Sequence, residues 1–149
     1  MIKFHEVIEP MRRIEGNATL PTRATRKSGA YDFYAKTNYT VKPNEIVKIW
    51  TDVKAEMDDD DVILLINVRS SMGGTWELAN TQGWIDADYY NNEKNDGNIG
   101  IFLRNTSDEV QTINKGDRIA QGMFTHYLIT VDDKPLSETR IGGFGSSGK

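Results

Sequence analysis

The chain has 149 residues, 38% of them hydrophobic, and a formal net charge of -4 at pH 7. This length predicts one domain that buries roughly two-thirds of its surface on folding. The acidic pI near 5.2 argues against a broad nucleic-acid surface, although a few converging arginines can still bind a small anionic ligand. The longest aliphatic run is too short to span a membrane and the N-terminus lacks a signal peptide's apolar stretch, so we expect a cytoplasmic protein with no membrane or nucleic-acid partner. Cysteine is absent, which excludes disulfides, thiolate metal sites and cysteine nucleophiles.

Several segments alternate between apolar and polar residues, which is typical of strands rather than helices. The first is the region from Val47 to Met57, where we expect one buried face and one solvated face. The expected solvated face contains Lys48, Asp52, Lys54 and Glu56. The acidic run at residues 58–61 predicts a solvated turn rather than a metal site, because consecutive like charges point in divergent directions.

The second half of the chain continues the strand pattern. Residues 62–68 predict a strand that is buried on both faces, and the alternation at residues 99–103 predicts another. Residues 118–129 predict a long strand that is entered through a turn at residues 114–117. Many short strands between Gly, Asn and Asp turns indicate an all-β fold, a single jelly-roll-like antiparallel barrel, because closure removes exposed strand edges.

Familiar catalytic patterns are absent from the sequence. His5 and His126 are the only histidines, and neither belongs to a Ser/His/Asp, HExxH or clustered metal-ligand pattern. The Gly-rich C-terminus superficially resembles a P-loop but lacks the required Ser or Thr. Because this tail is poor in apolar residues, we expect residues 139–149 to form a mobile arm attached to a domain of residues 1–138.

Short polar segments remain between the predicted strands, and taken singly each suits a turn or a surface. Together, in order and spacing, they resemble the five motifs of the homotrimeric dUTPase family from about Leu20 onward. These segments are residues 28–33, 68–73, 78–89, 115–121 and 140–148. The third is the most specific, because it matches the family's Asn…Gly-x-Ile-Asp-x-x-Tyr hairpin at Asn80, Gly83, Ile85, Asp86 and Tyr89. The family includes members of phage or prophage type, and this chain is a candidate for one.

The resemblance implies hydrolysis of dUTP to dUMP and pyrophosphate, which keeps uracil out of DNA and supplies dUMP. Water would attack the α-phosphorus while Mg²⁺ is chelated by the triphosphate. Asp86 would orient or deprotonate this water, Asn80 would hydrogen-bond the uracil edge, and Tyr89 would pack under deoxyribose and reject a 2′-hydroxyl. Asp32 would reach the metal through water. The other residues that the resemblance assigns to the substrate are Arg69, Ser70, Ser71, Gly73, Gly83, Ile85 and Gln121.

The resemblance also implies a homotrimer in which the C-terminal arm closes over a neighbouring subunit's site. Phe144 would lie on the uracil and Arg140 would meet the γ-phosphate. Gly145, Ser146 and Ser147 would offer backbone and hydroxyl donors. The closed arm would exclude water other than the nucleophile.

The sequence departs from the family pattern at a few positions. Val68 stands where Pro is common, and Gly29-Ala30 reverses the usual order. Residues 90–97 are longer than the compact family form, which predicts an extended hairpin. Arg140 lies one residue closer to Phe144 than in the commonest form.

Two alternatives are compatible with the same scaffold. A dCTP deaminase or a bifunctional relative shares the fold and an Arg-Ser-Ser segment, but Asp86 and Phe144 argue against it. The other alternative is a regulatory, protein-binding role, since a fold does not fix function. Because a pure binding module would not need Asp86, Tyr89 and Asn80, we expect such a role only as an addition to catalysis.

Overall fold

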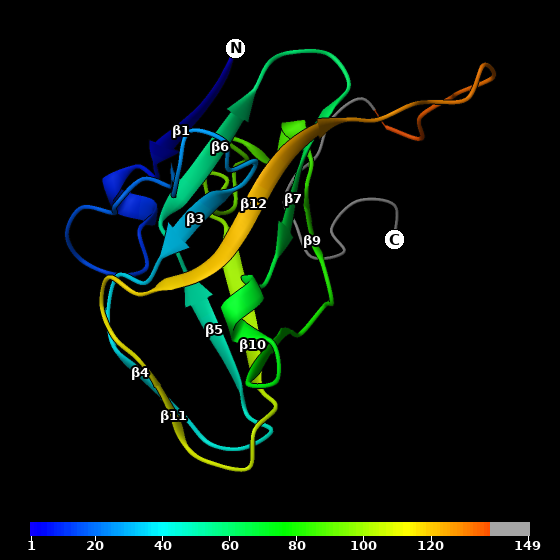
Figure 1. The fold of residues 1–149 in the computed structure, drawn as a ribbon. Helices are drawn as coiled ribbons and strands as arrows, with labels where there is room; N and C mark the ends of the chain where they lie inside the picture. The colour runs from blue at the N-terminus through cyan, green and yellow to red at the C-terminus, as the bar shows by residue number, and fades with distance from the viewer. Residues whose placement is uncertain (138–149) are drawn as a thin grey trace.

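The structure is a computed structural model that describes residues 1–137. Antiparallel strands wrap around one core, and the described helices are single 3-10 turns (Figure 1). The strands are β1 (Ile2–Glu6), β2 (Thr22–Arg23), β3 (Tyr31–Tyr34), β4 (Tyr39–Val41), β5 (Ile46–Trp50), β6 (Val53–Met57), β7 (Val62–Asn67), β8 (Trp76–Leu78), β9 (Gly83–Ile85), β10 (Gly100–Asn105), β11 (Gln111–Ile113) and β12 (Arg118–His126). The helical turns are η1 (Glu9–Met11), η2 (Ser70–Met72) and η3 (Ala87–Tyr89). The prediction of an all-β antiparallel fold is confirmed, and the predicted arm at residues 139–149 lies outside the described residues.

The strands form four small sheets rather than one continuous sheet. The largest has the order β2-β3-β12-β7-β9, and a second has the order β5-β10-β8. The other two sheets are the strand pairs β1-β6 and β4-β11. β12 is the longest strand and crosses the middle of the molecule, pairing with β3 on one side and β7 on the other (Figure 1). The inner faces of these sheets pack against each other, as expected for a jelly-roll-like barrel.

Hydrophobic side chains, many of them from the predicted strands, fill the core. β7 and β10 correspond to the segments predicted at residues 62–68 and 99–103, and their inward side chains are almost fully buried. The largest fully buried side chains include Phe33, Ile49, Leu64, Ile66, Ile99, Ile101, Leu103 and Ile119. None of the helical elements described is long and apolar enough to cross a membrane.

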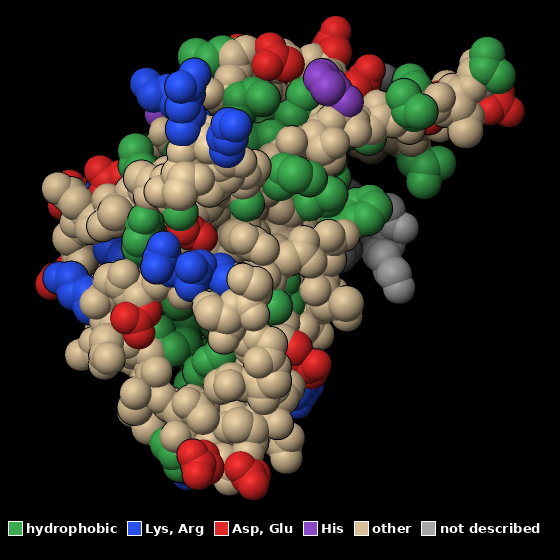
Figure 2. Space-filling view, viewed as in Figure 1, with side chains coloured by type: hydrophobic (Ala, Val, Ile, Leu, Met, Phe, Trp, Pro, Cys, Tyr) green, Lys and Arg blue, Asp and Glu red, His purple; other side chains and the backbone are tan. Residues whose placement is uncertain are grey.

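The strand predicted at residues 118–129 is shorter in the structure. It is entered through the predicted turn, where Asp117 N–H donates to the Asn114 carbonyl at 2.9 Å, but it ends at His126. Residues 127–137 leave the barrel as a projecting segment that carries exposed hydrophobic side chains (Figures 1 and 2). Leu128 and Leu136 on this segment are 97% and 95% exposed. An apolar segment that is so exposed in one chain is typical of a surface that contacts another protein.

The region from Val47 to Met57 differs from its prediction, because it forms two strands in different sheets. The chain turns a corner at Asp52, which adopts a left-handed φ of 56°. β5 on one side pairs with β10, and β6 on the other side pairs with β1. The predicted solvated face was therefore wrong for Asp52 and Lys54, whose side chains are buried in ion pairs.

The Asp52 carboxylate is the centre of a buried polar network at this corner. It accepts hydrogen bonds from Lys36 Nζ and Asn98 Nδ2 at 2.8 Å each. The backbone N–H groups of Arg13 and Ile14 donate to it at 2.9 and 3.1 Å. Burial by itself would raise the pKa of Asp52, but these donors favour the charged form more strongly and hold the pKa below its ordinary value. The network thereby ties the N-terminal loop to the corner between β5 and β6.

Candidate active site

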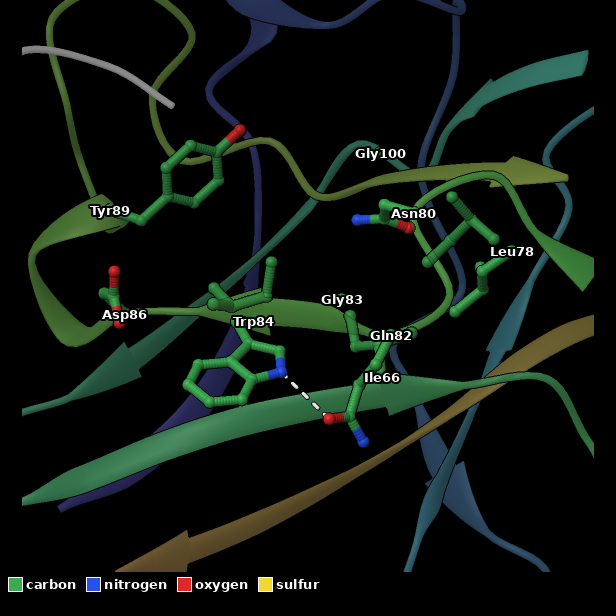
Figure 3. A pocket seen from close by; sticks show the side chains of 11 residues that line it. Ile66, Leu78, Asn80, Gln82, Gly83, Trp84, Asp86, Tyr89 and Gly100 are labelled. Carbon is green, nitrogen blue, oxygen red and sulfur yellow. Dashed lines mark hydrogen bonds between the residues drawn. The ribbon is translucent and has the colours of Figure 1, made fainter. Parts of the chain in front are cut away.

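The third motif forms one wall of a pocket between β7, β9 and β10. The pocket has a volume of about 240 Å³ and is lined by Ile66, Leu78, Asn80, Gln82, Gly83, Trp84, Ile85, Asp86, Tyr89, Gly100 and Ile101. Figure 3 shows Asp86 and Tyr89 at one end of this pocket and Asn80 and Leu78 at the other. An apolar floor with a few polar groups at its rim is typical of a small-molecule site.

Local backbone structure explains how these polar groups reach the pocket. Asp86 follows β9 directly and precedes η3, so its carboxylate stands where the strand ends. The Tyr89 N–H donates to the Asp86 carbonyl at 3.1 Å, which fixes the spacing of the two side chains. Gly83 allows β9 to lie close to β7, because a Cβ at this position would lie 3.1 Å from the Cβ of Ile66. The sequence pattern Gly-x-Ile-Asp-x-x-Tyr therefore has a geometric reason in this chain.

Tyr89 is held in the pocket by hydrogen bonds to its hydroxyl. Its side chain is buried, and its hydroxyl donates to the Asn98 carbonyl at 2.6 Å. The same hydroxyl accepts a hydrogen bond from Asn95 Nδ2 at 2.8 Å. The ring therefore forms a fixed wall of the pocket.

A second pocket contains residues of the first, second and fourth motifs. It has a volume of about 300 Å³ and is lined by Ala24, Ser28, Gly29, Ala30, Asp32, Arg69, Ser70 and Gln121. β12 brings the fourth motif to the first and second motifs, because Gln121 is paired with Asp32 of β3 and Asn67 of β7. Gln121 Nε2 also donates to the Val68 carbonyl at 3.3 Å.

Two arginines flank the carboxylate in this second pocket. Arg69 Nε donates to Asp32 Oδ1 at 3.1 Å, and Arg118 Nη1 lies 3.6 Å from Asp32 Oδ2. Arg69 also donates to Ser71 Oγ at 3.3 Å. Because the Asp32 side chain is only 8% exposed, the two cations offset the cost of burying its charge. Arg69 remains 23% exposed and can meet an incoming anion.

The residues present suit an indirect metal contact rather than a protein cage. Residues 1–137 contain no group of three or more His, Cys, Asp or Glu side chains that could hold a metal ion. Asp32 is the one carboxylate that lines the second pocket, and both of its oxygens face arginines. Mg²⁺ commonly keeps several waters and binds mainly through substrate phosphates, so this donor set fits a contact through water.

The structure does not bring all the predicted site residues together within one chain. Asn80, Gly83, Ile85, Asp86 and Tyr89 line the first pocket, whereas Asp32, Arg69, Ser70 and Gln121 line the second, and the two linings share no residue. Ser71 contacts Arg69, and Gly73 lines neither pocket. Arg140, Phe144, Gly145, Ser146 and Ser147 lie outside the described residues.

Some residues at these pockets were missed by sequence reasoning. Arg118 belongs to a motif that was recognised, and its basic charge beside a predicted anion site was a usable signal. Asn95 and Asn98 contact Tyr89 from a segment that matches no motif, so the sequence offered no signal for them. Trp84 lines the first pocket and is 67% exposed, a property that strand alternation alone does not reveal.

Comparison with known proteins identifies the family. The dUTPase family model matches residues 16–148. The chain belongs to the dUTPase family. The deoxyuridine 5'-triphosphate nucleotidohydrolase of Lactococcus lactis is 38% identical over 131 residues, which cover 87% of each chain. The corresponding protein of Swinepox virus is 36% identical over 140 residues, covering 91% of this chain and 94% of its own.

Solved structures agree with this assignment. The crystal structure of the dUTPase from Streptococcus mutans superposes with a TM-score of 0.74 and 30% sequence identity, covering 85% of this chain and 97% of that one. A dUTPase from phage phi11 has a TM-score of 0.69 at 21% identity, which shows that the fold is shared. The chain is thus a dUTP diphosphatase, and the relatives found give no support to a dCTP deaminase.

Proposed function

We propose that this dUTPase splits dUTP into dUMP and pyrophosphate by attack of water on the α-phosphorus, keeping uracil out of DNA and supplying dUMP. The observation that carries this mechanism is the first pocket, where Asp86 and Tyr89 lie at one end and Asn80 lies at the other. A carboxylate can orient and deprotonate water, and an amide can read the uracil edge. The pocket is thus equipped for base recognition and for nucleophile activation.

Tyr89 would refuse ribonucleotides in this arrangement. Its buried ring would lie against the 2′ carbon of the sugar, where a 2′-hydroxyl would collide with the ring or lose its hydrogen-bond partners. Gly83 and Ile85 on β9 would complete the base pocket through the backbone and through apolar contact. Discrimination between substrates would therefore depend on a rigid hairpin.

Residues of the second pocket would bind the phosphates. Arg69 can donate from its guanidinium, and Ser70 and Gln121 offer neutral donors on the same surface. Ser71 would support Arg69, with which it shares a hydrogen bond, and Gly73 would add backbone donors from the loop after η2. Opposite charge and a fixed fork geometry make an arginine-centred pocket suitable for a triphosphate.

Mg²⁺ would be carried mainly by the triphosphate, with Asp32 contacting it through water. When bound, the metal would neutralise phosphate charge and polarise the α-phosphorus. The ion pairs with Arg69 and Arg118 hold the Asp32 carboxylate in place for this contact. Removal of the metal by a chelator should abolish turnover, while Asp32→Asn should raise the Mg²⁺ concentration required for half-maximal rate.

The active assembly would be a homotrimer with sites between subunits. The two pockets carry complementary functions but share no lining residue within one chain, which suits a site that combines pockets of neighbouring subunits. An apolar cavity lined by Leu65, Trp84 and Leu128 and the exposed projecting segment offer surface for such contacts. The C-terminal arm, with Arg140, Phe144, Gly145, Ser146 and Ser147, would close over the combined site.

Pyrophosphate release from dUTP, dCTP, dTTP and UTP tests this proposal directly. We expect rapid release from dUTP and strong discrimination against the other three nucleotides. Asn80→Ala should reduce the discrimination between dUTP and dCTP, because a polar group left without its partner costs about 1–3 kcal/mol. Comparable kcat/KM values for dUTP and dCTP in the unmodified enzyme would contradict the assignment of the pocket to uracil.

A further inference from the structure

Residues 90–98, called the asparagine loop below, connect η3 to β10 and take no part in the chemistry proposed above. The loop is held in a tight fold by its own hydrogen bonds, among them Asp96 N–H to the Asn92 carbonyl at 2.9 Å and Asn98 N–H to the Asn95 carbonyl at 3.1 Å. Three of its residues have a left-handed φ: Asn91, Asp96 and Gly97. Gly, Asn and Asp are the residues that adopt this conformation at least cost, so the sequence of the loop suits its fold.

The loop contacts Tyr89 both at its side-chain hydroxyl and at its backbone carbonyl. At the ring end, the phenol hydroxyl donates to the Asn98 carbonyl at 2.6 Å and accepts from Asn95 Nδ2 at 2.8 Å. At the backbone end, Asn92 Nδ2 donates to the Tyr89 carbonyl at 2.8 Å. Gly97 permits this close approach, because a Cβ at that position would lie 3.0 Å from the Tyr89 carbonyl oxygen.

The loop is in turn fixed to the barrel. The Asn98 amide exchanges two hydrogen bonds with Asp52, one with its carboxylate at 2.8 Å and one with its N–H at 2.9 Å. Asp96 accepts from Lys54 Nζ at 2.7 Å and from the Ile8 N–H at 2.9 Å. These anchors are buried or partly buried, so the groups that hold the phenol cannot shift without breaking contacts in the core.

We propose that the asparagine loop positions Tyr89 and that Asn95 is thereby a specificity-determining positioning residue for 2′-deoxyribose against ribose. The inference rests on the proposed role of Tyr89 as the wall against the 2′ carbon. A steric wall discriminates only if it cannot retreat, because a small displacement of the ring would make room for a hydroxyl. Asn98 fixes the phenol from one side and Asn95 fixes it from the other.

A double-mutant cycle between Asn95 and the Tyr89 hydroxyl tests this inference. Asn95→Asp keeps the size and the Oδ1 acceptor, which serves Asn92 Nδ2 and Gly97 N–H, but removes the donor to the phenol. Tyr89→Phe removes the same hydrogen bond from the other partner, together with the bond from the phenol to the Asn98 carbonyl, so the inference stays testable if one variant folds poorly. The measured quantities are the ratio of kcat/KM for dUTP to that for UTP, and the ratio of Kd for UDP to that for dUDP by calorimetry.

We expect Asn95→Asp to lower both ratios by about two- to tenfold, the scale of one lost hydrogen bond, and Tyr89→Phe to lower them at least as much. The double variant should be no worse than Tyr89→Phe alone, because without the phenol hydroxyl the substitution at Asn95 has no hydrogen bond to the phenol left to remove. Glu93→Ala is the matched control, since Glu93 is exposed on the same loop, and it should leave both ratios unchanged. If Asn95→Asp lowered the ratios equally in the presence and absence of the hydroxyl, or did not lower them at all, the inference would be overturned.

Tyr89→Ala separates failure of this inference from failure of the proposed function. If Tyr89→Ala lowers both ratios while Asn95→Asp does not, Tyr89 is the wall but Asn95 does not position it. If Tyr89→Ala leaves both ratios unchanged, the role proposed for Tyr89 is wrong, and the inference about Asn95 fails with it. The diphosphate binding ratios report on the cycle even in a preparation without turnover.

Discussion

At the scale of single residues, Asp86 serves the fold through its main chain and the proposed catalysis through its side chain. Its backbone ends β9 and begins η3, and these roles use the main chain, whereas the carboxylate faces the pocket. Asp86→Asn should therefore fold normally and bind a non-hydrolysable dUTP analogue with Mg²⁺, but lose kcat by roughly a hundred-fold or more, the scale for removal of a general base. Single-turnover kinetics and calorimetry measure the two effects separately. A nearly unchanged kcat would show that Asp86 is only a turn residue.

Gly122 illustrates how one residue limits the packing of the barrel. It lies in the middle of β12, and a Cβ at this position would lie 2.9 Å from Phe33 Cε2 and 3.0 Å from Leu64 Cδ1. Gly122→Ala should thus lower the free energy of unfolding by about 1–3 kcal/mol, because both neighbours are fully buried and must shift. Gly29→Ala is the control, since its Cβ would meet nothing within 4 Å. Urea unfolding of the two variants should differ accordingly, and equal stabilities would contradict this view of the core.

At the scale of elements, the corner between β5 and β6 depends on a charged Asp52. Its folded-state pKa lies below the unfolded value of 3.8, so its stabilising contribution is complete above that pH and is lost as the pH falls through the folded-state pKa. Asp52→Asn should remove this part of the acid sensitivity. It should also lower stability at neutral pH by about 3–5 kcal/mol, because the buried Lys36 loses its counter-charge.

Urea unfolding at a series of pH values checks the prediction for Asp52. The difference in stability between wild type and Asp52→Asn should shrink as the pH falls below 3.8. Asp60→Asn is a suitable control, because Asp60 is exposed in the loop between β6 and β7. A constant difference at all pH values would show that the carboxylate acts through its shape and hydrogen bonds rather than through its charge.

The sequence predicted those elements in which local pattern and burial coincide. β7 and β10 were predicted because an aliphatic run and an alternation directly reflect their burial. The corner at Asp52 was not predicted, because the alternation continues through it and only tertiary partners show that Asp52 and Lys54 are buried. The end of β12 at His126 was also missed, since the apolar residues that follow are exposed in one chain.

For the candidate site too, residues within one short segment were predicted, whereas contacts between different segments were not. The hairpin with Asp86 and Tyr89 was predicted from its resemblance to the family's third motif, whose residues all lie in one short segment with fixed spacing. The support of Tyr89 by Asn95 and Asn98 could not be predicted, since neighbouring asparagines in a loop suit many turns equally well. The pairing of Arg118 with Asp32 depends on the register of β12 against β3, which a sequence pattern does not specify.

At the scale of the whole molecule, the separation of the two pockets predicts how subunits cooperate. One pocket holds the proposed nucleophile-activating Asp86, and the other holds the phosphate-binding Arg69. If every active site combines the first pocket of one subunit with the second pocket of a neighbour, damage to one pocket can be compensated by a different subunit. Sedimentation should accordingly give a particle of about three times 16.8 kDa.

Mixing two inactive variants tests this architecture. Asp86→Asn disables the first pocket, and Arg69→Ala disables the second while leaving Arg118 beside Asp32. When equal amounts are unfolded and refolded together, about a quarter of the sites should combine two intact pockets and restore a corresponding share of wild-type pyrophosphate release. Each variant refolded alone serves as the control and should stay inactive. If the mixture showed only the sum of the two residual activities, each subunit would contain a complete site, and the proposed sharing between subunits would be wrong.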